Sequence, residues 1–352
     1  MAPDFSLQGV CAKYFRSSRD ASAVQSSRRR NSRRRGDHAT ITSGSRVHLV
    51  HEPPTQSKLV PPTPDTEAAP ATTKWSPTAH WVVDTGTPLV PFMKWAGGKR
   101  WFVYAHNDLL PSSFNTYVEP FLGGGSVFFY LNPKKAVLGD ANPDLICAYQ
   151  GVQAYPHEVE EQLRHHHTRH SSEYYYQIRD SQPDSLPERA ARVIYLNRTC
   201  FNGIYRVNRQ GKFNVPIGSR TQVVFETDNF PAVSKLLKPA RIYLSDFERT
   251  IDRAKDGDLI FADPPYTVRH NNNGFVKYNE TLFSWADQIR LAEALKRARD
   301  RGAKVVVTNA AHDTVKELYE PHGFKTKIVS RFSAIAADSK KRKTFEELVV
   351  LS

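Results

Sequence analysis

The sequence predicts an α/β protein in which a mostly parallel sheet carries an inserted, largely helical region. From Pro91 onward, short apolar runs punctuated by glycine alternate with longer amphipathic stretches, which is the pattern of βαβ units. The stretch 151–240 is rich in His, Tyr and Arg and has little strand signal, so we expect it to be helical and separate from the sheet. The three cysteines lie far apart in the sequence, which excludes a disulfide scaffold and a thiolate zinc site.

Each expected element follows from a local run of residues. Short apolar, β-branched segments predict strands at 114–119, 135–139, 241–244, 258–262, 304–308, 324–329 and 346–351. A glycine turn entering a helix is expected at 123–131, a second helix begins within 143–150, and an amphipathic helix is expected at 286–301. Because strands and helices alternate on both sides of the inserted region, segments 91–150 and 241–352 are predicted to form one domain.

The charge of the chain predicts an acidic partner. Lys and Arg number 49 against 36 Asp and Glu, a formal net charge of +13, and nucleic acid is the commonest polyanion for such a protein. Residues 1–90 contain two arginine triplets and a Pro/Thr-rich stretch without periodicity, so we expect a disordered basic extension. A transit peptide, a basic arm on DNA phosphates and sequence upstream of the true start all remain open for it. No apolar run approaches the ~18 residues of a membrane span, and an intracellular, reducing location is expected.

The strongest catalytic signal is the sequence DPPY directly after the buried-strand pattern at 259–262. Its residues are Asp263, Pro264, Pro265 and Tyr266. The two prolines have a fixed φ and no N–H, so the chain leaves the sheet in a set direction with free carbonyl groups. A carboxylate and a carbonyl that accept both hydrogens of an exocyclic amino group would draw it toward sp³ geometry and stabilise the charge that develops during attack. The tyrosine ring offers a stacking face for a base, while the plain alternative is a Pro-Pro turn that ends a core strand.

Two glycine-containing segments suit a nucleotide-type cofactor. The sequence EPFLGGGS at 119–126 follows a strand and opens a helix, and Asp140 ends the next strand, where an acidic residue commonly binds ribose hydroxyls. Upstream, PFMKWAGGK at 91–99 supplies Trp95 and Lys99, residues able to cover a cofactor and contact its carboxylate. A structural turn, a helix cap, core packing and a solvated lysine are the respective alternatives. A phosphate-binding P-loop is excluded because no Ser or Thr follows the lysine.

A recognition segment follows in the inserted region. The sequence YLNRTCFNGIYRVNRQGKFNVPIG at 195–218 interleaves aromatic, amide and basic side chains, which suits phosphate contacts, base reading and stacking. A hairpin tip or a solvated charged face is the alternative. Taken in this order, the motifs resemble the Dam-type family of D12 class adenine-specific DNA methyltransferases, and the resemblance covers 91–352. It implies a Rossmann-like, S-adenosylmethionine-dependent methyltransferase sheet, with an inserted helical and hairpin DNA-recognition domain at 151–240.

The resemblance also implies the site residues. The S-adenosylmethionine contacts correspond to Trp95, Lys99, Phe121, Gly123, Gly125, Asp140 and Asp263. The catalytic motif corresponds to Asp263, Pro264, Pro265 and Tyr266. The hairpin that enters the major groove of DNA corresponds to 202–216, which implies Asn202, Arg206 as a guanine reader and Asn208 as a neighbouring contact. The histidines at 165–167 and His170 are expected at the surface, and no metal is expected.

The implied activity is methyl transfer to adenine N6 in double-stranded DNA. GATC is the first candidate target because 202–216 resembles the corresponding region of GATC enzymes. The protein is expected to be a cytoplasmic, nucleoid-associated monomer, and a cognate restriction endonuclease remains open. The alternatives are a methyltransferase-fold DNA-binding protein without catalysis, an N4-cytosine or RNA methyltransferase, and a Rossmann-type oxidoreductase. The last is disfavoured because the glycine turn lacks the GxGxxG pattern and DPPY has no role in hydride transfer.

Overall fold

The computed structural model describes residues 89–208, 210–267, 283–332 and 344–352. All but the last two residues of the extension predicted at 1–90 lie outside this range. Leu89 is buried at 3 % exposure within the hydrophobic core, so the core includes a residue that the sequence analysis had placed in the extension. Within the described part of the chain, no helix is long and apolar enough to cross a membrane.

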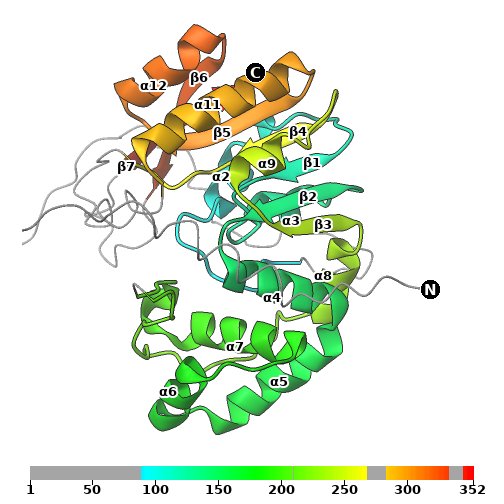
Figure 1. The fold of residues 1–352 in the computed structure, drawn as a ribbon, viewed down its shortest axis with the longest axis vertical. Helices are drawn as coiled ribbons and strands as arrows, with labels where there is room; N and C mark the ends of the chain where they lie inside the picture. The colour runs from blue at the N-terminus through cyan, green and yellow to red at the C-terminus, as the bar shows by residue number, and fades with distance from the viewer. Residues whose placement is uncertain (1–88, 209, 268–282, 333–343) are drawn as a thin grey trace, which may run out of the picture. The chain divides into compact units, whose positions relative to one another are not determined.

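The centre of the fold is a seven-stranded mixed sheet with the order β3-β2-β1-β4-β5-β7-β6 (Figure 1). The strands are β1 Tyr117–Glu119, β2 Ala136–Asp140, β3 Ala240–Leu244, β4 Leu259–Ala262, β5 Lys304–Ala310, β6 Lys325–Phe332 and β7 Thr344–Leu351. The strands β1 to β5 pair in parallel, whereas β7 pairs antiparallel with both β5 and β6. The predicted α/β sheet is confirmed, and the predicted strand at 114–119 is shorter, beginning at Tyr117.

Helices cover both faces of the sheet. The α-helices are α2 Arg100–Ala105, α3 Ser126–Leu131, α4 Pro143–Ala154, α5 Pro156–Arg169, α6 Ser172–Asp180, α7 Leu186–Thr199, α8 Phe230–Leu237, α9 Phe247–Ile251, α11 Trp285–Asp300 and α12 Asp313–Tyr319. Short 3-10 turns are η1 Asn107–Leu109, η2 Phe201–Gly203 and η3 Glu320–His322. Figure 1 shows α5, α6 and α7 grouped together, with α4 between them and the sheet.

The alternation of side chains along β4 explains why both faces are covered. All four residues of β4 are buried. Leu259 and Phe261 belong to the core cluster that contains residues of α3, α4 and α7, whereas Ile260 and Ala262 belong to the cluster with α9, α11 and α12. Successive side chains of a strand point to opposite faces, so an apolar run without alternation requires a core on each side of the sheet.

The inserted region is anchored by a buried arginine. Arg198, near the end of α7, is 3 % exposed and donates to both carboxylate oxygens of Asp228, at 2.6 and 2.8 Å. The same guanidinium donates to the carbonyl of Phe92 at 2.9 Å. A buried charge is tolerated only where it is paired and hydrogen-bonded, so this arginine fixes the segment around Phe92 against the inserted region.

One sequence expectation in this region was wrong. His166 is buried at 7 % exposure and its Nδ1 lies 2.8 Å from the hydroxyl of Tyr174, rather than lying at the surface. His170 is half-buried, with its Nδ1 2.9 Å from the hydroxyl of Tyr195. The period of α5 turns His166 toward α6 and α7, and burial lowers its pKa to about 4, so the neutral ring is retained in the fold.

Candidate active site

Three acidic side chains gather where neighbouring parallel strands end. Glu119 ends β1, Asp140 ends β2, and Asp263 follows β4 directly. Strand β1 lies between β2 and β4. On one side of β1 the parallel part of the sheet continues through β2 to β3, and on the other side it continues through β4 to β5. This is the topological switch point of an open α/β sheet, where the crevice outside the carboxyl ends binds ligands. The topology therefore brings together the predicted cofactor and catalytic motifs.

The glycine turn between β1 and α3 is held tightly against β2 and Trp95. The N–H of Gly123 donates to Asp140 Oδ2 at 3.1 Å, and the N–H of Asn142 donates to Asp140 Oδ1 at 2.9 Å. Gly123 has φ +46°, and a Cβ on it would lie 2.8 Å from Trp95 Cδ1. Gly125, at φ +64°, caps α3. Only glycine adopts such positions readily, so backbone and indole approach more closely than any other residue would permit.

The acidic groups beside this turn are poorly solvated. Burial raises the pKa of Asp140 to about 6, although the backbone N–H bonds oppose the increase. Glu119 is 3 % exposed, and burial raises the pKa of this carboxyl well above its usual range. Its Oε2 has no hydrogen-bond partner among the residues that the structure describes. A buried polar atom of this kind is expensive unless a ligand satisfies it. Sequence reasoning quoted Glu119 in the motif but gave it no role.

The other predicted cofactor aromatic, Phe121, packs toward the opposite side of the turn. It is half-buried and its ring stacks on Phe247 at a centroid distance of 5.3 Å. Phe283 meets the same ring edge-on at 5.5 Å. Phe121 thus belongs to an aromatic cluster with α9 and the segment before α11.

Asp263 is held by a lysine and a threonine. Lys99, only 4 % exposed, places its Nζ 2.8 Å from Asp263 Oδ1 and donates to the carbonyl of Gly97 at 2.8 Å. The hydroxyl of Thr308 on β5 donates to the same Oδ1, also at 2.8 Å. Burial raises the pKa of Asp263, and Lys99 works in the opposite direction. The structure therefore pairs Lys99 with the carboxylate of the DPPY motif. Sequence reasoning predicted neither this pairing nor the hydrogen bond from Thr308.

The rest of the DPPY motif contacts β7 and α11. Tyr266 is half-buried and its hydroxyl donates to Glu347 Oε2 at 2.6 Å. Pro264 is buried and Pro265 is half-buried, and the carbonyl of Pro265 is 3.5 Å from Nε2 of Gln288. Glu347 lies on β7, a strand that no sequence motif had connected with DPPY.

Two of the three predicted recognition residues, Arg206 and Asn208, lie on a hairpin. Its two arms are joined by the antiparallel bridge between Val207 and Phe213. Arg206 is exposed at its base, where Nε donates to Asn214 Oδ1 at 2.8 Å. The side-chain oxygen of Asn208 accepts from two backbone N–H groups across the tip, at 2.9 and 3.0 Å, so it stabilises the turn itself. Asn202 is exposed, outside the hairpin, in the left-handed conformation at φ +56°.

The hairpin and the inserted region contact the segment 91–99. Tyr205 stacks on Trp95 with a centroid distance of 5.4 Å and an interplanar angle of 28°. Its hydroxyl donates to Asp144 Oδ2 at 2.8 Å, near the start of α4. The side chain of Asn197 on α7 bonds both backbone groups of Lys94, accepting from N at 2.9 Å and donating to O at 2.8 Å. Sequence reasoning saw the aromatic residues of both segments but had no signal that they would meet.

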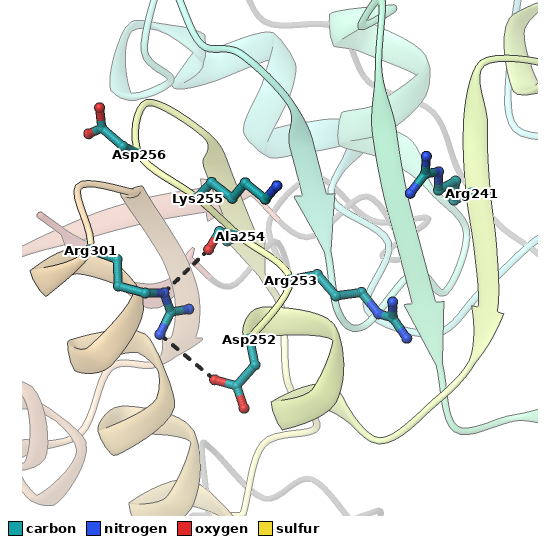
Figure 2. A pocket seen from close by; sticks show the side chains of 7 residues that line it. All are labelled: Arg241, Asp252, Arg253, Ala254, Lys255, Asp256 and Arg301. Atoms are coloured by element: carbon teal, nitrogen blue, oxygen red, sulfur yellow. Dashed lines mark hydrogen bonds and ion pairs between the residues drawn. The ribbon is translucent and has the colours of Figure 1, made fainter.

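A separate pocket of about 540 Å³ lies at the opposite end of the strands, where β3, β4 and β5 begin (Figure 2). It is lined by Arg241 near the start of β3, the turn 252–256 before β4, and Arg301 after α11. Arg301 donates to the carbonyl of Ala254 at 3.3 Å and lies 3.9 Å from Asp252 (Figure 2). These residues precede strands rather than follow them, so the pocket is not part of the crevice that holds the motifs. Among the described residues, no group of three or more His, Cys, Asp or Glu could hold a metal ion.

Comparison with known proteins agrees with this geometry. Residues 95–335 match the family model described as D12 class N6 adenine-specific DNA methyltransferase. The chain is 35 % identical to the type II methyltransferase M1.LlaDCHI of Lactococcus lactis subsp. cremoris, over 74 % of this chain and 95 % of the relative. It is 34 % identical to the type II methyltransferase M.MjaIII of Methanocaldococcus jannaschii, over 74 % and 98 %. It is 31 % identical to the DNA adenine methylase of Escherichia coli, over 74 % and 94 %.

Proposed function

The chain belongs to the D12 class N6 adenine-specific DNA methyltransferases, and on that premise we propose that it uses S-adenosylmethionine to methylate adenine in a short palindrome of double-stranded DNA. The observation that carries the proposal is the convergence of Asp140, Gly123 and Asp263 at the ends of adjacent strands. One crevice at a topological switch point then holds both the methyl donor and the amino group that receives the methyl.

The residues at the glycine turn fit S-adenosylmethionine. Asp140 offers carboxylate oxygens suited to ribose hydroxyls, and the buried Oε2 of Glu119 offers an acceptor for an ammonium group. A single Cβ at Gly123 would collide with the indole of Trp95, so the turn and the indole form one closely packed surface next to Asp140. We assign Trp95, Phe121, Gly123, Gly125, Asp140 and Asp263 to this cofactor site. Lys99, expected from the resemblance to contact the cofactor, is assigned to the same site, and it also pairs with Asp263.

The chain's own residues would prepare the adenine amino group. Asp263 and the carbonyl of Pro264 accept the two N6 hydrogens, which localises the nitrogen lone pair, while the ring of Tyr266 stacks on the flipped base. When bound, S-adenosylmethionine supplies a methyl group on a sulfonium and leaves as a neutral thioether. As the N–C bond forms, N6 becomes positive and releases one proton to a carboxylate oxygen of Asp263 and then to solvent. Burial raises the pKa of Asp263, which favours this uptake of a proton.

The recognition hairpin supports a target that contains guanine next to the methylated adenine. Arg206 is exposed, and a guanidinium bonds O6 and N7 of guanine together, which no other base offers in the major groove. Asn202 and Asn208 are assigned as neighbouring contacts on the same side of the inserted region. GATC is the first candidate, on the resemblance of 202–216 to GATC enzymes. A monomer is proposed, because the predicted cofactor and catalytic residues all lie on one chain.

The test is to sequence plasmid DNA, with detection of modified bases, from a methylation-free host that expresses the chain. We expect N6-methyladenine within one short motif and its absence with Asp263→Ala. Asp313→Ala, an exposed aspartate far from the motif in sequence, serves as the matched control and should methylate normally. Methylation of another motif with unaltered GATC rejects the target but not the activity. Modified cytosine alone, or no modification by a folded protein, rejects the proposed function.

A further inference from the structure

Strand β5 ends in two buried polar residues. Three valines run through its middle, and Thr308 and Asn309 follow them, both at 0 % exposure. A hydroxyl or an amide in such a place is costly unless a hydrogen bond satisfies it. A further valine would fill the same place in the sheet without that requirement. The role of the two polar side chains therefore lies in the contacts that they make.

The register of the sheet brings Thr308 to the catalytic aspartate. Strands β4 and β5 are parallel, and Ala262 pairs with Val307. The next residue along each strand direction is Asp263 after β4 and Thr308 on β5, so these two lie side by side. The hydroxyl of Thr308 donates to Asp263 Oδ1 at 2.8 Å. Strand pairing thus joins two residues that are 45 positions apart in the sequence.

The contacts of the Asp263 carboxylate are concentrated on one oxygen. Oδ1 accepts from Thr308 and lies 2.8 Å from Nζ of Lys99, whereas no described residue donates a hydrogen bond to Oδ2. A lysine ammonium is a point charge on a flexible stem, so it constrains the distance to the carboxylate more than its orientation. Threonine is β-branched and stiff at χ1. The hydroxyl of Thr308 is therefore the contact that fixes the plane of the carboxylate.

The other polar residue of β5 supports the same motif through a helix. Nδ2 of Asn309 donates to Oε1 of Gln288 on α11 at 3.0 Å. Nε2 of Gln288, which is also 0 % exposed, lies 3.5 Å from the carbonyl of Pro265. Consecutive residues of β5 thus reach the first and the third residue of DPPY, one directly and one through α11. The end of β5 is therefore a platform for this motif.

We propose that Thr308 is a positioning residue for adenine methylation: its hydroxyl fixes Asp263 through Oδ1, so that Oδ2 faces the N6 amino group and accepts its hydrogen. As the bond between N6 and the methyl carbon forms and the bond from that carbon to sulfur breaks, Oδ2 takes the proton that N6 loses. An acceptor oriented before the reaction stabilises the developing charge without reorganisation. The inference rests on the proposed function, since it takes Asp263 as the group that holds N6.

The decisive variants are Thr308→Val and Thr308→Ser. Valine keeps the branched shape and loses the hydroxyl, whereas serine keeps the hydroxyl and loses the methyl group. Single-turnover methylation of a duplex that contains the target should slow about 10- to 100-fold in Thr308→Val. Thr308→Ser should stay within about 3-fold of wild type. A threonine needed only for packing predicts the reverse order, because deletion of a buried methyl group leaves a cavity.

Thr250→Val is the matched control. Thr250 on α9 is also 0 % exposed, and its hydroxyl donates to the carbonyl of Asp246 at 3.3 Å. The same substitution there removes a buried hydroxyl and one hydrogen bond from a helix that carries none of the predicted site residues. Turnover by this variant should remain within about 3-fold of wild type.

The ligand affinities give a second readout. The dissociation constants for S-adenosylhomocysteine and for the duplex should change less than about 3-fold in Thr308→Val, because the orientation of Oδ2 matters most when N6 becomes positive. A loss of turnover accompanied by an equal loss of affinity for either ligand would overturn the proposal. Equal turnover in Thr308→Val and Thr250→Val would also overturn it, as would Thr308→Ser being as slow as Thr308→Val.

A second pair of variants covers the case in which Thr308→Val does not fold. Thr308→Ala and Thr308→Ser differ only in the hydroxyl, so the serine variant should be about 10- to 100-fold faster in single-turnover methylation. Equal rates for these two variants would leave the hydroxyl without a role.

Failure of this inference is distinguishable from failure of the proposed function. A wild-type protein that binds DNA and S-adenosylhomocysteine but forms no N6-methyladenine would reject the proposed function. A wild-type protein that methylates adenine, with Thr308→Val as active as Thr250→Val, would reject only the role of Thr308.

Discussion

Replacing Gly123 by alanine tests the tight contact between the glycine turn and Trp95 and the proposed role of this contact in cofactor binding. Gly123 has φ +46°, and an added Cβ would lie 2.8 Å from Trp95 Cδ1. An L side chain in the left-handed region costs ~1 to 2 kcal/mol. The indole must also retreat by about 0.6 Å, from 2.8 Å to the ordinary contact distance of 3.4 Å, which loosens its stack on Tyr205, worth ~0.5 to 1.5 kcal/mol. The sum is about 1.5 to 3.5 kcal/mol, or, at ~2 to 4 °C per kcal/mol, a decrease of roughly 3 to 14 °C in the melting temperature.

Gly124→Ala is the matched control within the same turn. Its φ is not positive, and the nearest atom to an added Cβ is Trp95 Cβ at 3.4 Å, an ordinary contact. We expect less than about 1 kcal/mol of destabilisation for this change, within the range for a glycine that a side chain tolerates. Thermal unfolding and calorimetric titration with S-adenosylhomocysteine measure both effects. Gly123→Ala should bind the ligand about 10- to 100-fold more weakly, because the displaced indole no longer lies where it would contact the ligand.

Equal melting temperatures and equal affinities for the two variants would refute the reasoning. Such a result would mean that the turn relaxes without strain and that Trp95 does not close over the cofactor. A lower melting temperature with unchanged affinity would support the strain at Gly123 but would show that Trp95 does not contact the cofactor.

Three further predictions concern charge, recognition and coupling. Burial raises the pKa of Asp140 from 3.8 to about 6, so the folded protein favours the neutral carboxyl group. This preference contributes about 3 kcal/mol to the stability of the fold below pH 4, and the contribution is lost as the pH rises through 6. Urea unfolding from pH 4 to 7 should therefore show a smaller fall in stability for Asp140→Asn than for wild type, and parallel curves would contradict this. Arg206→Ala should relax selectivity at one guanine by about 10- to 100-fold in assays with single-base-substituted duplexes; a uniform loss with weaker salt dependence would instead indicate a phosphate contact. Tyr205→Leu should weaken binding of S-adenosylhomocysteine about 2- to 10-fold in calorimetry, since Trp95 loses its stacking partner, and unchanged affinity would show that the stack is irrelevant to the cofactor.

Local sequence patterns were sufficient to predict the helices and strands, and the motifs that follow the ends of strands. The apolar run at 259–262 predicted a buried strand, and Asp263 to Tyr266 followed it in the structure as expected. Pro143 predicted the start of a helix, and Asn142 caps that helix through its side-chain oxygen. These signals work because the residues that determine each turn, cap or strand are neighbours in sequence.

Long-range partners could not be found in the same way. The sequence placed His166 at the surface and gave no sign that Lys99, a predicted cofactor contact, would also pair with Asp263, because neither segment reveals what packs against it. In the structure Lys99 pairs with Asp263, and His166 is buried beside Tyr174. Burial of a polar side chain depends on which elements cover it, and local periodicity carries no such information.

The amino-acid sequence by itself determined the α/β architecture, the glycine turn, the DPPY motif and the basic character of the protein. Only the tertiary structure decided that Tyr205 stacks on Trp95 and that Glu347 bonds Tyr266. The stack of Tyr205 on Trp95 requires the inserted region to fold back on the segment 91–99. The bond between Tyr266 and Glu347 requires β7 to enter the sheet antiparallel between β5 and β6. Both are consequences of strand order and chain crossing, which bring together residues about 80 to 110 positions apart through the packing of the whole core.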